Sequence, residues 1–86
     1  MIVDDEPLAR ERIRSLLREE ADVEIVSECA SGEEAVEQIG RQNPDLAFLD
    51  VQMPEMDGFE VLQNVPAEKL PVVIFTTAFD QHAVHA

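Results

Sequence analysis

The sequence predicts an α/β fold with a parallel sheet, because short apolar segments alternate with segments of helical periodicity along the chain. Two of the apolar segments, 46–49 and 71–75, are continuously hydrophobic, which is typical of strands buried on both faces of a parallel sheet. The expected order is βαβαβαβα, and connections of this kind place helices on both faces. We therefore expect residues 1–86 to form one domain around a doubly wound sheet.

The first half of the chain is expected to hold two strands and two helices. Residues 2–3 form a short apolar strand, and residues 8–20 carry apolar side chains at helical spacing opposite four arginines. Partial alternation predicts a half-exposed edge strand at 23–26. Ser31 precedes a glutamate by three residues, the spacing of a capping box, so a second helix begins there and is expected to end at Gly40.

The second half repeats the alternation of strand and helix. The strand at 46–49 ends at Asp50, and Asp57 can cap a third helix because a glutamate follows three residues later. The buried side of that helix is expected to hold Phe59, Leu62 and Val65. A further strand follows at 71–75, and residues 80–86 have the pattern of a last helix.

Composition and charge narrow the class of function. The net charge of −13 argues against direct contact with nucleic acid, which needs clustered Lys and Arg, and suits a divalent cation or a basic partner. No apolar run approaches the roughly 20 residues that span a bilayer, and no signal peptide is apparent. A single cysteine, Cys29, excludes an internal disulfide and fits a reducing cytosol, where we expect it to be a packing residue.

Polar residues gather at the expected carboxyl ends of three strands, where parallel sheets bind ligands. The first strand ends in Asp4 and Asp5, the third ends in Asp50, and the fourth runs into Thr76 and Thr77. If these strands are neighbours, three carboxylates and a hydroxyl meet at one edge of the sheet. Three carboxylates that close repel one another unless a cation holds them, and Mg²⁺ prefers such hard oxygen ligands.

Three segments closely resemble the receiver domains of two-component response regulators: Val3-Asp4-Asp5-Glu6-Pro7, Leu49-Asp50-Val51-Gln52-Met53-Pro54-Glu55-Met56-Asp57-Gly58-Phe59-Glu60 and Pro71-Val72-Val73-Ile74-Phe75-Thr76-Thr77-Ala78. The resemblance covers essentially the whole chain and implies the flavodoxin-like receiver fold with strand order 2-1-3-4. Two further segments are similar to the subgroup whose output is a LytR/AlgR-type DNA-binding domain: Leu8-Ala9-Arg10-Glu11-Arg12-Ile13 and Thr77-Ala78-Phe79-Asp80.

The resemblance implies a role for each site residue. Asp50 matches the phosphoacceptor, which takes a phosphoryl group from a histidine kinase, and Thr77 matches the switch hydroxyl. Asp5 matches a direct Mg²⁺ ligand, Asp4 the carboxylate that holds metal-bound water, and Gln52 the residue whose backbone carbonyl binds the metal. The implied function is a cytoplasmic signalling switch for an output domain. Its only chemistry would be its own phosphorylation and dephosphorylation.

The chain departs from the family pattern at its carboxyl end. The family's fifth strand, which carries a lysine that pairs with the phosphoryl group, and the fifth helix are missing from this sequence. Lys69 is its one lysine, and it precedes the strand at 71–75, so it cannot substitute. We therefore expect an incomplete receiver domain. We also expect the strand at 71–75 to pair across a homodimer or to be covered in another way.

Two other functions remain open at this stage. One is a receiver-like interaction module that no longer accepts phosphate. The other is a phosphohydrolase with a nucleophilic Asp, although such enzymes generally have a second Asp two residues later, where this chain has Gln52. His82 and His85 are expected to be surface residues. The arginines of 8–20 are interpreted as a solvated face that also suits contact with a kinase.

Overall fold

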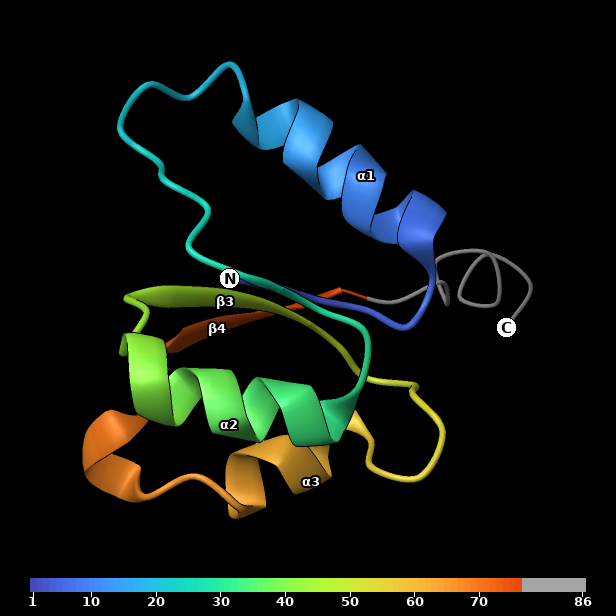
Figure 1. Cartoon of the computed structure of the whole chain (residues 1–86), viewed down its shortest axis with the longest axis vertical. Coiled ribbons are helices and arrows are strands. Elements are labelled where there is room, and N and C mark those ends of the chain that lie inside the picture. Colours follow the sequence, from blue (N-terminus) through green and yellow to red (C-terminus); the bar gives the residue numbers. More distant parts are fainter. Residues whose placement is uncertain (77–86) are drawn as a thin grey trace.

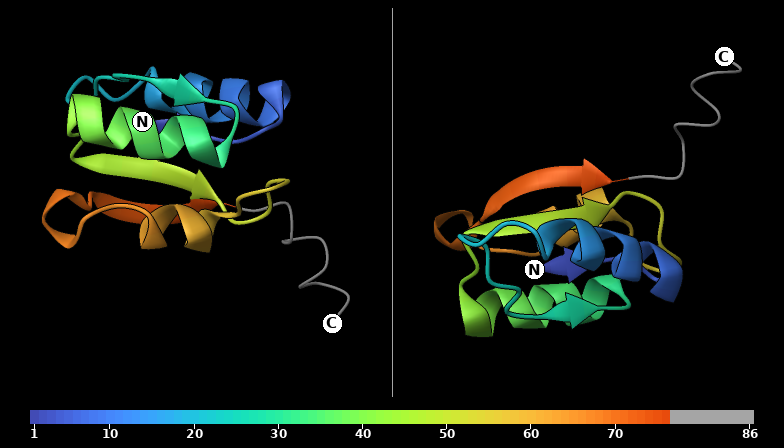
Figure 2. Two further views of the ribbon diagram at one scale, coloured as in Figure 1. Left: turned by 60° about the horizontal axis from the view of Figure 1, so that its bottom comes forward. Right: turned by 90° about the horizontal axis from the view of Figure 1, so that it is seen from above.

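Four parallel strands form a single sheet in the computed structural model, which describes residues 1–76. The strands are β1 (Ile2–Val3), β2 (Glu28–Cys29), β3 (Leu46–Asp50) and β4 (Val72–Thr76). Their order is β2-β1-β3-β4, which confirms the predicted arrangement, and Figure 2 shows β2 and β4 at the two edges. Since every neighbouring pair is parallel, the carboxyl ends of all four strands lie along one edge of the sheet.

The helices cover the two faces of the sheet unequally (Figure 1). Helix α1 (Pro7–Leu17) lies alone on one face, while α2 (Gly32–Gln42) and α3 (Gly58–Gln63) pack side by side on the other. A short 3-10 helix, Ala67–Lys69, connects α3 to β4 and was not predicted. Within the described residues, none of the helices has both the length and the apolar character that a membrane crossing requires.

Capping side chains fix where α2 and α3 begin. The Ser31 hydroxyl accepts a hydrogen bond from the Glu34 backbone N–H at 3.2 Å, which confirms the predicted start of α2. At α3 the capping box is complete, because Asp57 accepts from the Glu60 N–H and Glu60 accepts from the Asp57 N–H. These interactions satisfy backbone donors that the first helical turn leaves free.

The predicted end of α2 at Gly40 is wrong by two residues. The helix continues to Gln42, and Asn43 then adopts the left-handed conformation with φ 46°. Asparagine tolerates this conformation better than most residues, and Pro44 behind it cannot continue a helix. Helix α1 also ends early, at Leu17, three residues before the predicted end.

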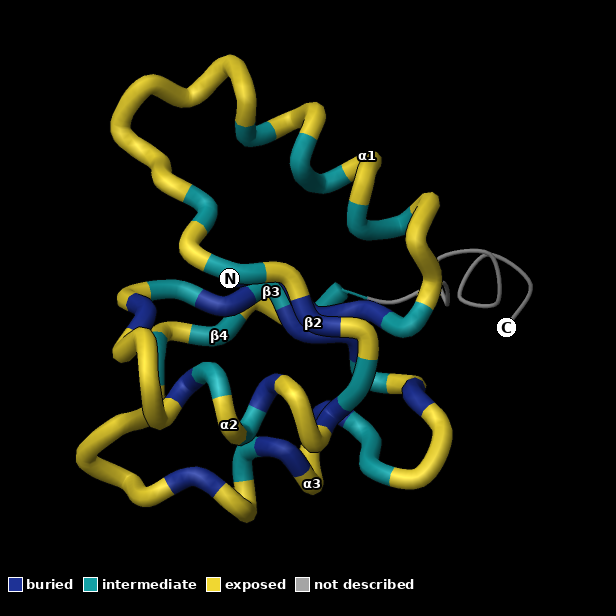
Figure 3. Tube along the Cα trace, in the orientation of Figure 1, coloured by how far each residue is buried: buried dark blue, intermediate teal, exposed yellow. Residues whose placement is uncertain are grey.

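The core lies between the sheet and the α2–α3 layer (Figure 3). Its α3 side consists of Val61 in the helix and Val65 just beyond the end of the helix, which are 0% and 7% exposed. Val65 was predicted correctly and Leu62 is partly buried, but Phe59 is 54% exposed. Phe59 does not belong to this core, and its ring lies against that of Phe75, with the ring centroids 5.2 Å apart.

The second strand does not lie where the sequence predicted it. Residues 23–26 are irregular, and β2 is Glu28–Cys29. The ladder aligns Ile2 of β1 with Glu28, so residues 23–26 lie beyond the amino end of β1 and face no β1 residue. Without a partner, their alternating pattern cannot form a ladder. Cys29 is fully buried, as expected of a packing residue. The helix predicted at 80–86, with His82 and His85, lies outside the described residues.

Candidate metal centre

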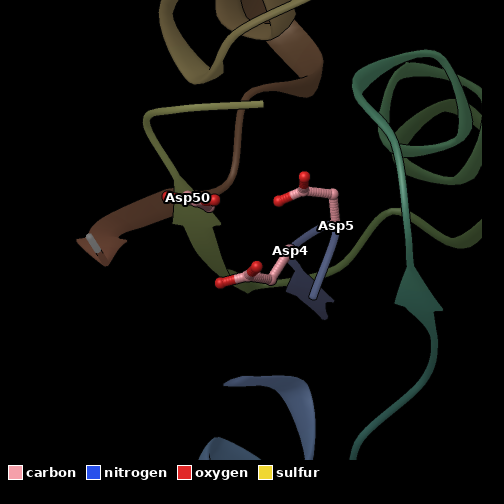
Figure 4. A group of neighbouring side chains, drawn as sticks. All are labelled: Asp4, Asp5 and Asp50. Atoms are coloured by element: carbon pink, nitrogen blue, oxygen red, sulfur yellow. The ribbon is translucent and has the colours of Figure 1, made fainter. Parts of the chain in front are cut away.

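Two neighbouring strands bring the acidic residues together. The ladder between β1 and β3 aligns Val3 with Leu49, so Asp4, which follows β1, lies beside Asp50 at the end of β3. Each of Asp4, Asp5 and Asp50 offers a carboxylate oxygen, and these oxygens all lie within 4.8 Å of one another (Figure 4). The predicted convergence of the three carboxylates is therefore present in the structure.

Backbone N–H groups orient two of the three carboxylates. The Asp4 Oδ1 accepts a hydrogen bond from the Glu6 N–H at 2.9 Å, and the Asp50 Oδ1 accepts one from the Gln52 N–H at 3.2 Å. Asp4 and Asp50 are each only 7% exposed, whereas Asp5 is more open to solvent. The site thus consists of two buried, hydrogen-bonded carboxylates, those of Asp4 and Asp50, and a more exposed one, that of Asp5.

Burial and mutual repulsion both disfavour ionised carboxylates here. Burial, and then repulsion from Asp4, raise the pKa of Asp50 to about 6, although the hydrogen bond from the Gln52 N–H lowers it. Burial likewise raises the pKa of Asp4, against the hydrogen bond from the Glu6 N–H. A divalent cation would reverse this balance. Three convergent carboxylate oxygens are a hard donor set that fits Mg²⁺, with positions left for water or phosphate oxygens.

Arg10 is a residue beside the site whose contact with it was not predicted from the sequence. Its Nη1 donates a hydrogen bond to the backbone carbonyl of Asp4 at 2.6 Å, so it contacts the site's own main chain. The sequence alone places Arg10 on a solvated face with the other arginines of residues 8–20. The sequence nevertheless indicates the observed position. Arg10 is adjacent to Ala9 and three residues before Ile13, so it lies on the side of the helix that carries the apolar residues.

Gly58 is a second residue whose role was not predicted, although it belongs to the quoted motif. Its N–H donates to the Val51 carbonyl at 2.9 Å, which brings the start of α3 against the end of β3. A Cβ at this position would lie 2.6 Å from the Asp50 carbonyl oxygen and 3.1 Å from the Val51 Cα. Glycine therefore allows the close approach of the two segments behind Asp50.

Thr77 and Gln52 are the two remaining residues that were predicted to belong to the site. Thr77, the expected switch hydroxyl, lies outside the described residues. Its neighbour Thr76 is aligned with Asp50 in the β3–β4 ladder, and its buried Oγ1 has no hydrogen-bond partner among the residues that the structure describes. The Gln52 N–H contacts Asp50, while the metal-binding role of the Gln52 carbonyl stays a prediction.

The sheet order and the acidic edge together define a class of domain: a doubly wound module that can present a carboxylate nucleophile beside a hard cation. Comparison with known sequences identifies the family. The sequence profile of the response regulator receiver domain family matches residues 1–86, and the chain belongs to this family.

Curated relatives place the domain within larger proteins. The chain is 48% identical over 86 residues to the transcriptional regulatory protein BtsR of Salmonella typhi and 45% identical to that of Escherichia coli K12. In each case the match covers 100% of this chain and 36% of the relative. The chain therefore spans about a third of the length of these transcriptional regulators.

Solved structures show the same fold. The signal receiver domain of a NarL response regulator from Mycobacterium tuberculosis is 38% identical, with a TM-score of 0.81, over 96% of this chain and 68% of that one. A structure of the CheX–CheY–BeF3–Mg²⁺ complex from Borrelia burgdorferi is 31% identical, with a TM-score of 0.81, over 96% and 63% of the two chains. The likeness agrees with the observed strand order.

Proposed function

We propose that this domain accepts a phosphoryl group on Asp50 from the phosphohistidine of a histidine kinase, with Mg²⁺ held by Asp4, Asp5, Asp50 and the Gln52 carbonyl. The observation that carries the proposal is the convergence of three carboxylates within 4.8 Å, with Asp50 at the end of the interior strand β3. A carboxylate so placed is a nucleophile beside a cation site. The complex of CheY with BeF3 and Mg²⁺, whose fold this chain shares, supports this proposal by likeness.

The transfer needs in-line placement and charge neutralisation more than proton transfer. The Gln52 N–H holds Oδ1 of Asp50, so Oδ2 is the oxygen available to attack phosphorus. The new Oδ2–P bond forms as the P–N bond to the kinase imidazole breaks, and the bonding electrons leave with the imidazole nitrogen. When bound, the cation offsets the charge of the carboxylates and the phosphoryl oxygens. Thr77 follows β4 directly and is proposed to donate its hydroxyl hydrogen to a phosphoryl oxygen.

The proposed reaction is confined to this domain. It would catalyse only its own phosphorylation and the later hydrolysis of the acyl phosphate, with no substrate of its own to release. We propose that the signal passes to a DNA-binding output domain elsewhere in the full-length protein, in the cytoplasm. The net charge of −13 makes this domain itself a poor DNA ligand, and helix α1 is the proposed kinase contact.

A phosphorylation-incompetent interaction module is the second candidate. The observation in its favour concerns the described residues alone: the lysine that they include, Lys69, lies at the amino end of β4, where its Nζ donates to the Gly40 carbonyl at 3.3 Å. Lys69 therefore lies at the amino ends of the strands, whereas Asp50 lies at their carboxyl ends, so Lys69 cannot reach a phosphoryl group on Asp50. A phosphohydrolase is less favoured, because the amide of Gln52 cannot act as a general acid.

We also propose a homodimer, because the outer edge of β4 has no partner strand among the described residues. Val72 and Ile74 are 68% and 46% exposed, and no strand pairs with the outer side of β4 in the described part of the chain. Exposed edge strands favour pairing with another chain.

The phosphoacceptor proposal is tested by adding Mg²⁺ and beryllofluoride, a phosphoryl mimic, while following backbone amide signals by NMR. We expect saturable shifts around Asp50 that disappear in Asp50→Asn. The matched control is Asp45→Asn, because Asp45 is an exposed residue at the opposite end of β3 and should leave the shifts intact. Mg²⁺-dependent shifts without a beryllofluoride response, or no response to either, would favour the interaction module.

A further inference from the structure

The turn between β1 and α1 is held by three hydrogen bonds that all involve Asp4. Its N–H donates to the Cys29 carbonyl of β2 at 3.0 Å, and its side chain accepts from the Glu6 N–H at 2.9 Å. Its carbonyl accepts the third bond, from Arg10 at 2.6 Å. The first two bonds come from the sheet and from the turn itself, so of these three bonds only the one from Arg10 comes from the helix.

We propose that Arg10 is a positioning residue for the cation site. The Asp4 carbonyl belongs to the peptide group that joins Asp4 to Asp5, so the bond from Arg10 fixes the plane of that peptide. The orientation of this plane determines ψ of Asp4 and φ of Asp5, the two backbone torsions between their Cβ atoms, and so restricts where the two carboxylates point relative to each other. Arg10 thereby holds Asp4 and Asp5 in the arrangement that meets Asp50, without contacting the cation itself.

Glu28 holds Arg10 in this place. Its carboxylate on β2 lies 3.7 Å from Nε of Arg10 and accepts hydrogen bonds at 2.8 Å from Arg14. The side chains of Arg10 and Glu28 are only 18% and 27% exposed, so this pair is better shielded from water than an ordinary surface pair. The chain of contacts therefore runs from β2 through Glu28 and Arg10 to the site.

The charge of Arg10 and its hydrogen bond act in opposite directions. A positive charge beside the site repels Mg²⁺, so its removal alone would tighten cation binding. The hydrogen bond orders the ligands before the cation arrives, so its removal would weaken binding. Within the described residues, no other Arg or Lys is hydrogen-bonded to Asp4, Asp5 or Asp50. The sign of the change in affinity therefore separates a positioning role from an electrostatic one.

The test measures Mg²⁺ affinity of the chain and its variants by calorimetry, and it rests on the proposed cation site. We expect Arg10→Ala to weaken binding by about tenfold, the usual cost of losing a residue that orients a metal ligand. Arg10→Lys keeps a donor for the Asp4 carbonyl and should recover part of the loss. The matched control is Arg14→Ala, which removes the closer Glu28 contact and leaves the Asp4 bond in place.

Unchanged or tighter Mg²⁺ binding in Arg10→Ala would overturn the proposal, and so would an equal loss in Arg14→Ala. Hydrogen exchange of the Asp5 and Glu6 amides gives a readout without any cation. Faster exchange in Arg10→Ala supports positioning, and unchanged exchange contradicts it. If the unmodified chain binds no Mg²⁺, the proposed function fails, and the exchange rates still decide the role of Arg10.

Discussion

At the scale of single residues, Asp50 combines burial with the neighbouring charges of Asp4 and Asp5, and both disfavour its ionised form. Its place at the end of a continuously apolar strand predicted a buried carboxylate, and it is 7% exposed beside Asp4 and Asp5. That reasoning succeeded because parallel strands place their carboxyl ends on one edge. It missed Arg10, because helical periodicity separates apolar from polar faces and does not show that an arginine can turn back to a main-chain carbonyl.

The raised pKa of Asp50 predicts an unusual effect of pH on stability. The pKa is about 6 in the folded chain and 3.8 without the fold, so between these values the folded state binds more protons. The free energy of unfolding contributed by Asp50 therefore falls as pH rises through this window. In the absence of a bound divalent cation, the loss of stability caused by the ionisation of Asp50 is complete above about pH 6.

Asp50→Asn should remove this loss of stability. Near neutral pH and without Mg²⁺, we expect the variant to be more stable by on the order of 1 kcal/mol, which raises Tm by about 4–8 °C. The difference should shrink below pH 4, where both proteins are neutral at this position, and Mg²⁺ should stabilise only the unmodified chain. Thermal unfolding followed by circular dichroism at several pH values measures this. An Asn variant less stable at neutral pH would contradict the pKa argument.

At the scale of elements, the sequence predicted best where a local contact decides the boundary. The starts of α2 and α3 depend on Ser31 and on Asp57, whose partners lie three residues away. The position of β2 depends instead on its register with β1, which aligns Ile2 with Glu28 across 26 positions of sequence. Alternation at 23–26 carried no information about that register, so the strand was placed too early.

Gly58 gives a prediction at this scale. A Cβ there would lie 2.6 Å from the Asp50 carbonyl oxygen, and both neighbours are backbone that cannot rotate away. We expect Gly58→Ala to destabilise the fold by about 1–3 kcal/mol, as overpacking does, and to weaken Mg²⁺ binding by displacing Asp50.

Gly40→Ala is the matched control for this substitution. Gly40 also lies in a helix, but a Cβ there would meet nothing within 4 Å. Alanine is the better helix former, so this variant should be more stable by about 0.5–1 kcal/mol. Denaturant unfolding distinguishes the two. A Gly58 variant as stable as the Gly40 variant would show that the β3–α3 approach tolerates a methyl group.

At the scale of the whole molecule, the order of strands and helices along the chain predicted a parallel sheet with helices on both faces, and the resemblance to receiver domains supplied the strand order that the structure confirms. What the order could not predict is how unevenly the faces are covered. Helix α1 has no fully buried residue, and its Leu8 and Leu16 are 70% and 66% exposed. The α2–α3 face, in contrast, holds most of the buried side chains.

The proposed homodimer through β4 rests on the exposure of this strand at the edge of the sheet within the described residues. Val72 is 68% exposed on β4, and its strand offers unpaired backbone groups along its outer edge within the described residues. We expect sedimentation velocity to show association that grows with protein concentration, and Val72→Lys to abolish it, because a charge on an edge strand opposes pairing. Leu8→Lys is the matched control, since Leu8 is 70% exposed on α1, away from β4. A single monomeric species at every concentration, or an equal effect of both lysines, would exclude pairing through this strand.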